Sequence, residues 1–208
     1  MEKIISGLAQ FKSSSFEERK ALFAELANGQ SPEVLFITCA DSRIDPNLIT
    51  QTEPGDLFVI RNAGNIVPPH TRDADGVTAS IEYAVAVLGI KQVVVCGHSD
   101  CGAMKGALNT AALSDLPHVQ DWLDHSRAAV ETVKAKHGQA TISELDAVTK
   151  QNVELQLNHL RTHPAVSAKM STGDVELHGW VYNIGEGSVE AYDENKGAFV
   201  SVQERYTA

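Results

Sequence analysis

The sequence lacks any run of about 18 apolar residues, the length that a helix needs to cross a bilayer, and its start has no secretory-signal architecture. Basic residues are also scarce: 17 Lys and Arg residues against 27 Asp and Glu residues give a formal net charge of −10. A surface of this sign repels nucleic acid and anionic membranes. We therefore expect neither as a partner, and we expect a cytoplasmic location.

Cysteine is rare, with Cys39, Cys96 and Cys101 the only three. So small and odd a number argues against structural disulfides in a reducing compartment and favours metal or catalytic roles. His98 and Cys101 are close enough to chelate one ion, whereas Cys39 lies about sixty residues away, which excludes the two local ligand pairs of a zinc finger. Cys96 lies inside an apolar run and is expected to be a small buried hydrophobe.

Internal repeats, low-complexity tracts and interdomain linkers are not visible in the sequence either. Its 208 residues, 43% of them hydrophobic, suit a single domain over 1–208, with residues 1–30 as an N-terminal helical arm. Ser15 and Glu18 are spaced as a capping box that would begin the second helix of this arm. Because the arm is amphipathic and longer than a small sheet can cover, we expect part of it to pack on a partner subunit.

Apolar runs that end in turn residues predict the strands of one sheet. Continuous runs cover 33–39, 57–60 and 91–97, and alternating residues at 175–182 and 188–192 predict a C-terminal hairpin. Strands that alternate with helices predict an α/β fold with a central, mainly parallel β-sheet of about four strands, a C-terminal antiparallel strand or hairpin, and helices on both faces. The expected helices cover 46–50, 76–89, 102–108, 117–137 and 141–163.

Side chains that carry chemistry follow two of these strands, at the point where each strand ends. Cys39 closes the first strand, and His98 and Cys101 follow the third. The carboxyl ends of neighbouring parallel strands meet at one edge of the sheet, where open α/β folds bind their ligands. Two thiolates and one imidazole are ligands for Zn2+, and three protein ligands leave a fourth position open. The sequence therefore predicts a catalytic zinc site.

Asp41 and Arg43 follow Cys39 at intervals of two residues, so their side chains are expected on the same side of the chain. Two thiolates cancel the charge of a zinc ion, and such a site acidifies water less than three neutral imidazoles would. A further group must then orient hydroxide. We expect Asp41 to accept a hydrogen bond from it, while the guanidinium of Arg43 binds Asp41 bidentately and keeps it off the metal.

The segments Cys39-x-Asp41-x-Arg43 and Gly97-His98-Ser99-x-Cys101-Gly102 together resemble the motif pair of the β-class carbonic anhydrases, and the resemblance extends over roughly 30–184. It implies one zinc ion per chain and the reaction CO2 + H2O ⇌ HCO3− + H+, by attack of zinc-bound hydroxide on carbon.

The resemblance also implies a set of substrate-binding residues. Gln30 stands nine residues before the first cysteine ligand, where the family has a glutamine that reaches the substrate across a dimer interface, so a homo-oligomer with the dimer as its minimal unit is expected. The backbone N–H of Gly102 corresponds to a donor to bound substrate. Phe58, Ala63 and Tyr83 stand where the family has the residues that line its small apolar pocket.

One position departs from part of the family. Some members have a tryptophan three residues before the first cysteine, beside a bicarbonate pocket that switches the site off, whereas this chain has Phe36. We therefore expect the open form, with Asp41 paired to Arg43. His70 is a candidate proton relay, because the pKa of histidine lies near neutrality. Members docked in carboxysomes often carry a long C-terminal extension that is not seen here, so the cytoplasm is expected rather than the carboxysome.

Other readings of the same residues stay open. Gly97 to Cys101 is similar to the G-x-S-x-G nucleophile elbow of α/β-hydrolases, but the final glycine is a cysteine and Cys39-x-Asp41-x-Arg43 is left without a role. A non-catalytic zinc module would need a fourth protein ligand, and Asp41 serves only if Arg43 releases it. The same scaffold could also hydrolyse another small linear molecule such as CS2.

Overall fold

The structure is a computed structural model and describes residues 1–73 and 75–207, which divide into two compact units, Met1–Ser31 and Pro32–Ala208. The second unit holds the whole sheet and all the residues of the two motifs. That residues 1–208 act as a single domain stays a prediction. Among the described residues, no helix is both long enough and apolar enough to cross a membrane.

The first unit is the predicted helical arm. Its segments are α1 (Glu2–Gln10), a π-helical turn (Phe11–Ser15), α2 (Phe16–Glu18) and α3 (Lys20–Leu26). The capping box predicted at Ser15 is wrong, because Ser15 has helical backbone angles and its side chain caps nothing. The hydroxyls of Ser13 and Ser14 instead donate to the carbonyl of Gln10, inside helical backbone. The apolar side chains of Ile4, Ile5 and Leu8 are each more than half exposed.

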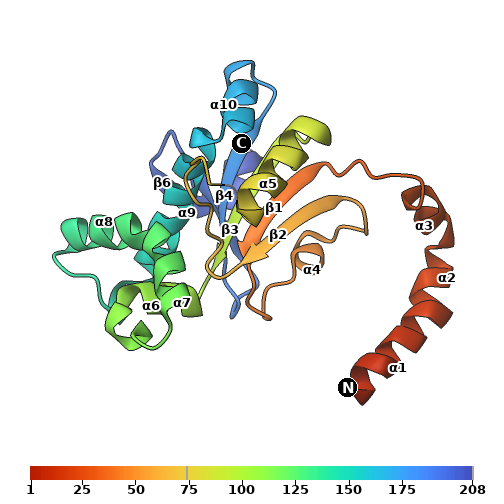
Figure 1. The fold of residues 1–208 in the computed structure, drawn as a ribbon, viewed down its shortest axis with the longest axis horizontal. Helices are drawn as coiled ribbons and strands as arrows, with labels where there is room; N and C mark the ends of the chain where they lie inside the picture. The colour runs from red at the N-terminus through yellow and green to blue at the C-terminus, as the bar shows by residue number, and fades with distance from the viewer. Residues whose placement is uncertain (74, 208) are drawn as a thin grey trace. The chain divides into compact units, whose positions relative to one another are not determined.

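The second unit is built on one six-stranded sheet in the order β2-β1-β3-β4-β5-β6 (Figure 1). The first four strands in this order are parallel, and β5 and β6 are antiparallel to their neighbours. This confirms the predicted fold class and adds a short edge strand, β6. The strands are β1 (Val34–Cys39), β2 (Leu57–Asn62), β3 (Gln92–His98), β4 (Glu176–Tyr182), β5 (Val189–Asp193) and β6 (Ala198–Ser201).

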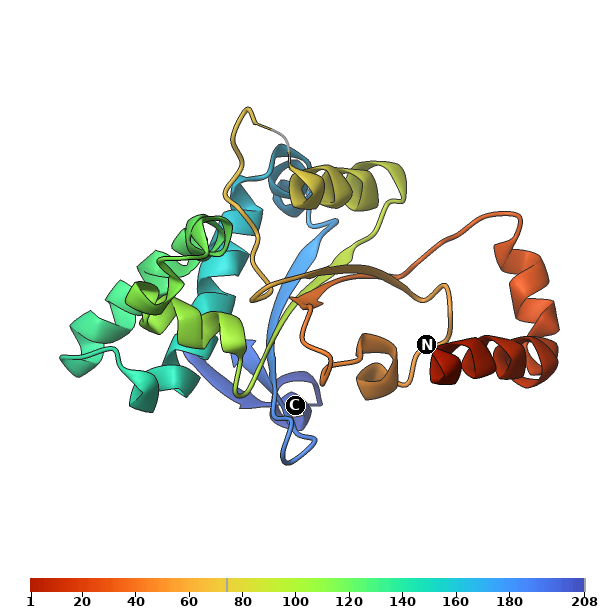
Figure 2. The ribbon, with the colours of Figure 1, turned by 60° about the horizontal axis from the view of Figure 1, so that its bottom comes forward.

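Helices cover both faces of the sheet because both faces of its central strands are apolar (Figure 2). Alternate side chains of β1, such as Leu35 and Phe36, enter two different clusters. One cluster is completed by α5 (Gly76–Glu82), α9 (Leu145–Thr162) and α10 (Pro164–Ser171). The other is completed by α6 (Gly102–Leu108), α8 (Arg127–His137) and the start of α9.

Side-chain caps fix several helix starts where the sequence predicts them. The carboxylate of Asp45 accepts from the N–H of Leu48 to begin α4 (Pro46–Thr50), and that of Asp75 accepts from Thr78 to begin α5. Thr141 and Glu144 form a reciprocal capping box before α9. The remaining helices are α7 (Pro117–Leu123), separated from α8 by a 3₁₀ turn, and α11 (Val202–Tyr206).

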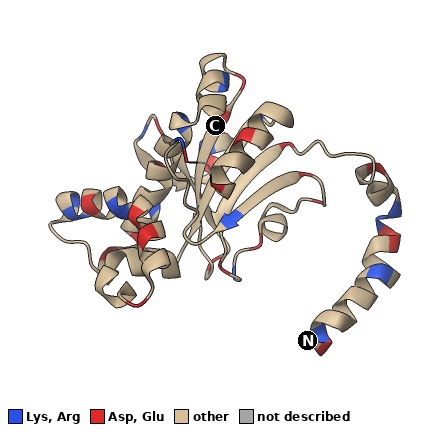
Figure 3. Cartoon of the chain, in the orientation of Figure 1, with Lys and Arg blue, Asp and Glu red and all other residues tan. Residues whose placement is uncertain are grey.

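Charge is spread over the helices rather than gathered on one element. Figure 3 shows that basic residues are interspersed with an acidic one along α8, which runs from Arg127 through Glu131 to Lys134 and Lys136. The carboxylates outnumber the cations over the whole chain, as the net charge of −10 requires.

Candidate metal centre and active site

Three buried side chains meet at the carboxyl edge of the sheet. Cys39 is the last residue of β1, His98 is the last residue of β3, and Cys101 is the N-cap of α6. Parallel pairing of Thr38 with Cys96 places the ends of these two strands side by side. The two sulfurs and a ring nitrogen all lie within 4.8 Å of one another. The predicted convergence of these residues, distant in the sequence, is confirmed.

The imidazole of His98 is held with one nitrogen free. Its Nδ1 lies 2.8 Å from the carbonyl oxygen of Ser99, so Nδ1 carries the proton and donates it there. Nε2 is then a lone-pair donor, and it is buried with no hydrogen-bond partner among the described residues. A buried polar atom without a partner is costly in a folded protein. A metal ion held by this nitrogen and the two sulfurs would remove that cost.

The two sulfurs lie close enough to affect each other's acidity. The neighbouring Cys101 thiol, with smaller help from His98 and the N–H of Gly64, holds the pKa of Cys39 well below its usual range against the opposing effect of burial. The Cys39 thiolate and burial then raise the pKa of Cys101. Two thiolates this close repel each other unless a cation lies between them. This donor set therefore fits a divalent ion of the soft-ligand type, such as zinc.

Asp41 is bound on both oxygens by Arg43. Nε of Arg43 donates to Oδ1 at 2.9 Å and Nη2 donates to Oδ2 at 2.8 Å, while the backbone N–H of Arg43 adds a third bond to Oδ1 at 2.9 Å. These bonds hold the pKa of the Asp41 carboxyl well below its usual range. Oδ2 also lies 3.9 Å from Nε2 of His98, so the carboxylate faces the group of three ligands.

Arg61 fixes the path of the loop that carries Asp41, and the sequence analysis did not identify it. Its Nε donates to the carbonyl of Cys39 at 3.0 Å, and its Nη2 donates to the carbonyls of Asp41 and Ile44 at 2.7 and 2.8 Å. Arg61 is opposite Thr38 in the pairing of β2 with β1. A charged residue near the end of an otherwise apolar strand was the available signal.

The loop after β2 closes over Cys39. Its Gly64 donates a backbone N–H to the Cys39 sulfur at 3.4 Å. Gly64 has a φ of +84°, and a Cβ there would lie 3.0 Å from the side chain of Ala103, so both backbone angle and space require glycine. The carbonyl of Gly64 in turn accepts from the amide of Asn152 on α9 at 3.1 Å.

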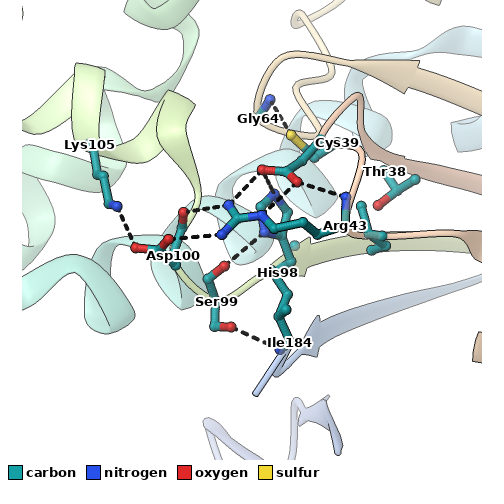
Figure 4. Close-up of polar contacts among 12 residues, drawn as sticks. Thr38, Cys39, Arg43, Gly64, His98, Ser99, Asp100, Lys105 and Ile184 are labelled. Carbon is teal, nitrogen blue, oxygen red and sulfur yellow. Dashed lines mark hydrogen bonds and ion pairs between the residues drawn. The ribbon is translucent and has the colours of Figure 1, made fainter. Parts of the chain in front are cut away.

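A second carboxylate, Asp100, binds the outer side of Arg43 (Figure 4). Nη1 of Arg43 donates to its Oδ2 at 3.0 Å, and Nη2 also donates to its backbone carbonyl at 3.2 Å. The other carboxylate oxygen, Oδ1, is paired with the ammonium group of Lys105 on α6. The role of Asp100 could not be predicted from its spacing, because its contact with Arg43 spans 57 positions. Lys105 has no predicted role either.

Ser99 ties the same segment to the sheet. Its backbone N–H donates to the carbonyl of Tyr182 at 2.8 Å, and its hydroxyl accepts from the N–H of Ile184 at 3.0 Å. The hydroxyl that the hydrolase reading would use as a nucleophile is thus engaged at the end of β4.

Cys96, one strand position before Gly97, is fully buried, and burial raises its pKa to about 12.

The residues implied for substrate binding are not all brought to this group. Phe58 and Tyr83 lie together, with ring centroids 6.1 Å apart, but Phe58 pairs with Leu35, four residues before the end of β1. That offset is about 13 Å along the strand. The carbonyl of Ala63 accepts from the indole of Trp122 at 2.8 Å. Gly102 is the first residue of α6, directly after Cys101.

Two further predicted residues are exposed. Gln30 belongs to the first unit. His70 is an exposed loop residue whose ring contacts that of His163. Their roles stay predictions.

Comparison with known proteins agrees with this geometry. A family model described as carbonic anhydrase matches residues 34–189. A carbonic anhydrase of Pseudomonas aeruginosa is 49% identical over 204 residues, covering 98% of this chain and 93% of that protein. The solved β-carbonic anhydrase CcaA matches with a TM-score of 0.94 and 46% identity, covering 97% of this chain and 98% of that one. The chain belongs to the β-class carbonic anhydrases.

Further relatives of this β-carbonic anhydrase agree. A carbonic anhydrase of Synechocystis is 47% identical over 210 residues, covering all of this chain and 77% of that protein. A tetrameric β-carbonic anhydrase of the ascomycete Sordaria macrospora matches with a TM-score of 0.82 and 30% identity, covering 96% of this chain and 98% of that one. The predicted family and enzyme class are confirmed, so the protein is an enzyme of reversible CO2 hydration.

Proposed function

We propose that this β-carbonic anhydrase hydrates CO2 at one zinc ion per chain, held by Cys39, His98 and Cys101, with Asp41 orienting the nucleophile and Arg43 holding Asp41. The observation that carries the proposal is the meeting, within 4.8 Å, of two buried sulfurs and one imidazole nitrogen that has no hydrogen-bond partner in 1–73 and 75–207.

Zinc supplies Lewis acidity, which makes hydroxide available from water near neutral pH. The chain's own residues supply everything else. Asp41 has one carboxylate oxygen near the three ligands. This oxygen can accept a hydrogen bond from the attacking hydroxide, which turns a lone pair of the hydroxide toward the substrate. Arg43, bound to both oxygens of Asp41, keeps this carboxylate ionised and oriented.

We also propose that the site has the open form, in which Asp41 stays off the metal because Arg43 holds it. A carboxylate so close to a metal ion competes for the fourth coordination position. Here three N–H groups of Arg43 are already bound to Asp41. Phe36 supports the open form as well, because it stands where the switchable members of the family carry tryptophan, and its ring packs edge-on against Trp180 at 6.0 Å.

We propose a homodimer as the smallest active unit. The arm presents Ile4, Ile5 and Leu8 to solvent in the isolated chain, and large exposed apolar side chains on one helix mark a surface for another protein. Phe58 lies too far back along β2 to line the pocket of its own chain, and the ring of Tyr83 lies beside it. We therefore place both residues, with Gln30, at the site of the partner subunit. A relative from Sordaria macrospora is tetrameric, which supports an oligomer. A cytoplasmic location stays a prediction.

The test is stopped-flow CO2 hydration on metal-analysed protein, with Asp41→Asn as the variant. The proposal predicts one zinc per chain in both proteins and turnover at least about 100-fold lower in the variant, the cost of removing an orienting group in the transition state. Full turnover in Asp41→Asn would contradict the role of Asp41. Loss of zinc from this variant would assign Asp41 to metal binding instead.

A further inference from the structure

Arg43 is shared between two carboxylates. Its Nε and Nη2 donate to the carboxylate of Asp41. Its Nη1 donates to the carboxylate of Asp100, and Nη2 also donates to the Asp100 backbone carbonyl (Figure 4). The side chain is 43% exposed, so water competes for each of these bonds. The hold of Arg43 on Asp41 therefore depends on what fixes its outer nitrogen.

Asp100 is itself fixed from two directions. Its φ is +57°, in the left-handed region, and it lies between His98 and Cys101 in a segment that Ser99 binds to the end of β4. Lys105, on the first turns of α6, takes the carboxylate oxygen that Arg43 does not use. With that oxygen engaged, Asp100 offers Arg43 one carboxylate oxygen rather than a bidentate edge.

We infer that Asp100 and Lys105 are positioning residues that act through Arg43. Lys105 limits Asp100 to a single carboxylate bond with Arg43, and Asp100 anchors the outer nitrogen, so that the Nε and Nη2 edge stays on Asp41. The four residues form a row of ion pairs in the order Lys105, Asp100, Arg43, Asp41. Positive and negative charges alternate along this row, so every neighbouring pair attracts. This inference rests on the proposed function, because it assigns to these ion pairs the task of keeping Asp41 away from the fourth metal position.

Exposed ion pairs contribute little to stability one at a time, but a network with a bidentate Arg–carboxylate pair holds geometry. Weakening the anchor frees Arg43 to leave Asp41, and Asp41 then competes for the metal. A small anion that must occupy the same metal position binds less well when Asp41 is there. Plain electrostatics predicts the opposite for Asp100→Asn, since removal of a negative charge favours an anion.

The experiment compares holoenzyme carrying Asp100→Asn with wild type, and adds azide titrations of the cobalt-substituted proteins followed by visible absorption. Asparagine keeps the size of the side chain and tolerates the left-handed backbone, so the fold is preserved. We expect kcat to fall about fivefold and azide affinity to fall about fivefold, the scale of one exposed ion pair. In an Asp41→Asn background, the loss of azide affinity should disappear.

Lys105→Met should lower both kcat and azide affinity, as Asp100→Asn does. Lys105→Arg should keep both near their wild-type values, because a cation is again available to Oδ1 of Asp100. Lys134→Met, at an exposed lysine of α8, is the control for net charge. Unchanged or tighter azide binding in Asp100→Asn would overturn the inference. If wild-type holoenzyme fails to hydrate CO2, the proposed function fails instead, and the azide titrations still decide whether Asp100 governs Asp41.

Discussion

The three cysteines of this protein have different chemistry although all are buried. Cys39 and Cys101 flank the free nitrogen of His98, whereas Cys96 lies inside β3 among apolar side chains. We expect Cys39→Ser to lose zinc and all CO2 hydration, because an alcohol is a poor zinc ligand beside a thiolate. Cys96→Ala should keep one zinc per chain and lose only about 1 kcal/mol of unfolding free energy to a small cavity.

Zinc content by atomic emission and unfolding in urea measure these two effects. A Cys96→Ala protein without zinc would contradict the assignment, since it would place the third cysteine in the metal group.

Arg61 is the residue on which the position of the Asp41 loop depends most. It donates to three backbone carbonyls, those of Cys39, Asp41 and Ile44. Hydrogen bonds from a charged donor contribute about 1.5–3 kcal/mol each when buried and less when exposed. We expect Arg61→Met to lower the unfolding free energy by about 1–3 kcal/mol and to lower kcat through the misplaced Asp41.

The matched control for that prediction is Arg127→Met, at an exposed arginine of α8. Thermal unfolding and stopped-flow turnover are the measurements. Equal effects of the two substitutions would mean that Arg61 does no more than add charge.

At the scale of elements, close packing of α9 on the sheet sets the positions of the strand ends. Gly179 of β4 faces Val153 and Leu157 of α9, and a Cβ at that position would lie 2.8 Å and 3.0 Å from their side chains. We expect Gly179→Ala to lower the unfolding free energy by about 1–3 kcal/mol through overpacking. Val153→Ala should relieve part of this, so the double variant loses less than the sum of the single variants.

Urea unfolding of the four proteins in this cycle gives the coupling. Additive losses would show that α9 moves freely away from β4 and that its packing does not fix the strand.

Strand ends and helix caps could be predicted from the sequence where they depend only on neighbouring residues. Local signals sufficed for the strand end at Cys39 and for the capping box of Thr141 and Glu144, and they placed the end of β3 at Gly97, one residue before its end at His98. The same spacing at Ser15 and Glu18 forms no box, because the chain before Ser15 is already helical. The strand β6 was missed, since four partly exposed edge residues form no buried apolar run.

The supports of the site were harder to predict for a different reason. Arg61, Asp100 and Lys105 act through contacts that depend on where a neighbouring strand or loop brings a partner. Long charged side chains reach several ångströms in many directions, so their spacing in the sequence does not name the group they bind. The ligands themselves were predictable because parallel strands bring their carboxyl ends together whatever the connections between them.

At the scale of the whole molecule, the assembly decides whether a site is complete. If Gln30 serves the site of the partner subunit, Gln30→Ala and Asp41→Asn chains damage different halves of a shared site. We expect each homodimer to be impaired, and a purified heterodimer of the two to recover about half of wild-type turnover, because a two-fold dimer then has one intact site.

Differently tagged chains, co-expressed and purified over both tags, allow this measurement, with the two homodimers as controls. A heterodimer no more active than the average of the homodimers would place Gln30 at the site of its own chain.

The most direct test of the whole account is zinc K-edge X-ray absorption of the purified protein. The account predicts one zinc per chain with two sulfur neighbours, one imidazole nitrogen and one further light atom, as Cys39, Cys101 and His98 require. Absence of zinc, or a coordination shell with any other number of sulfurs, would contradict it.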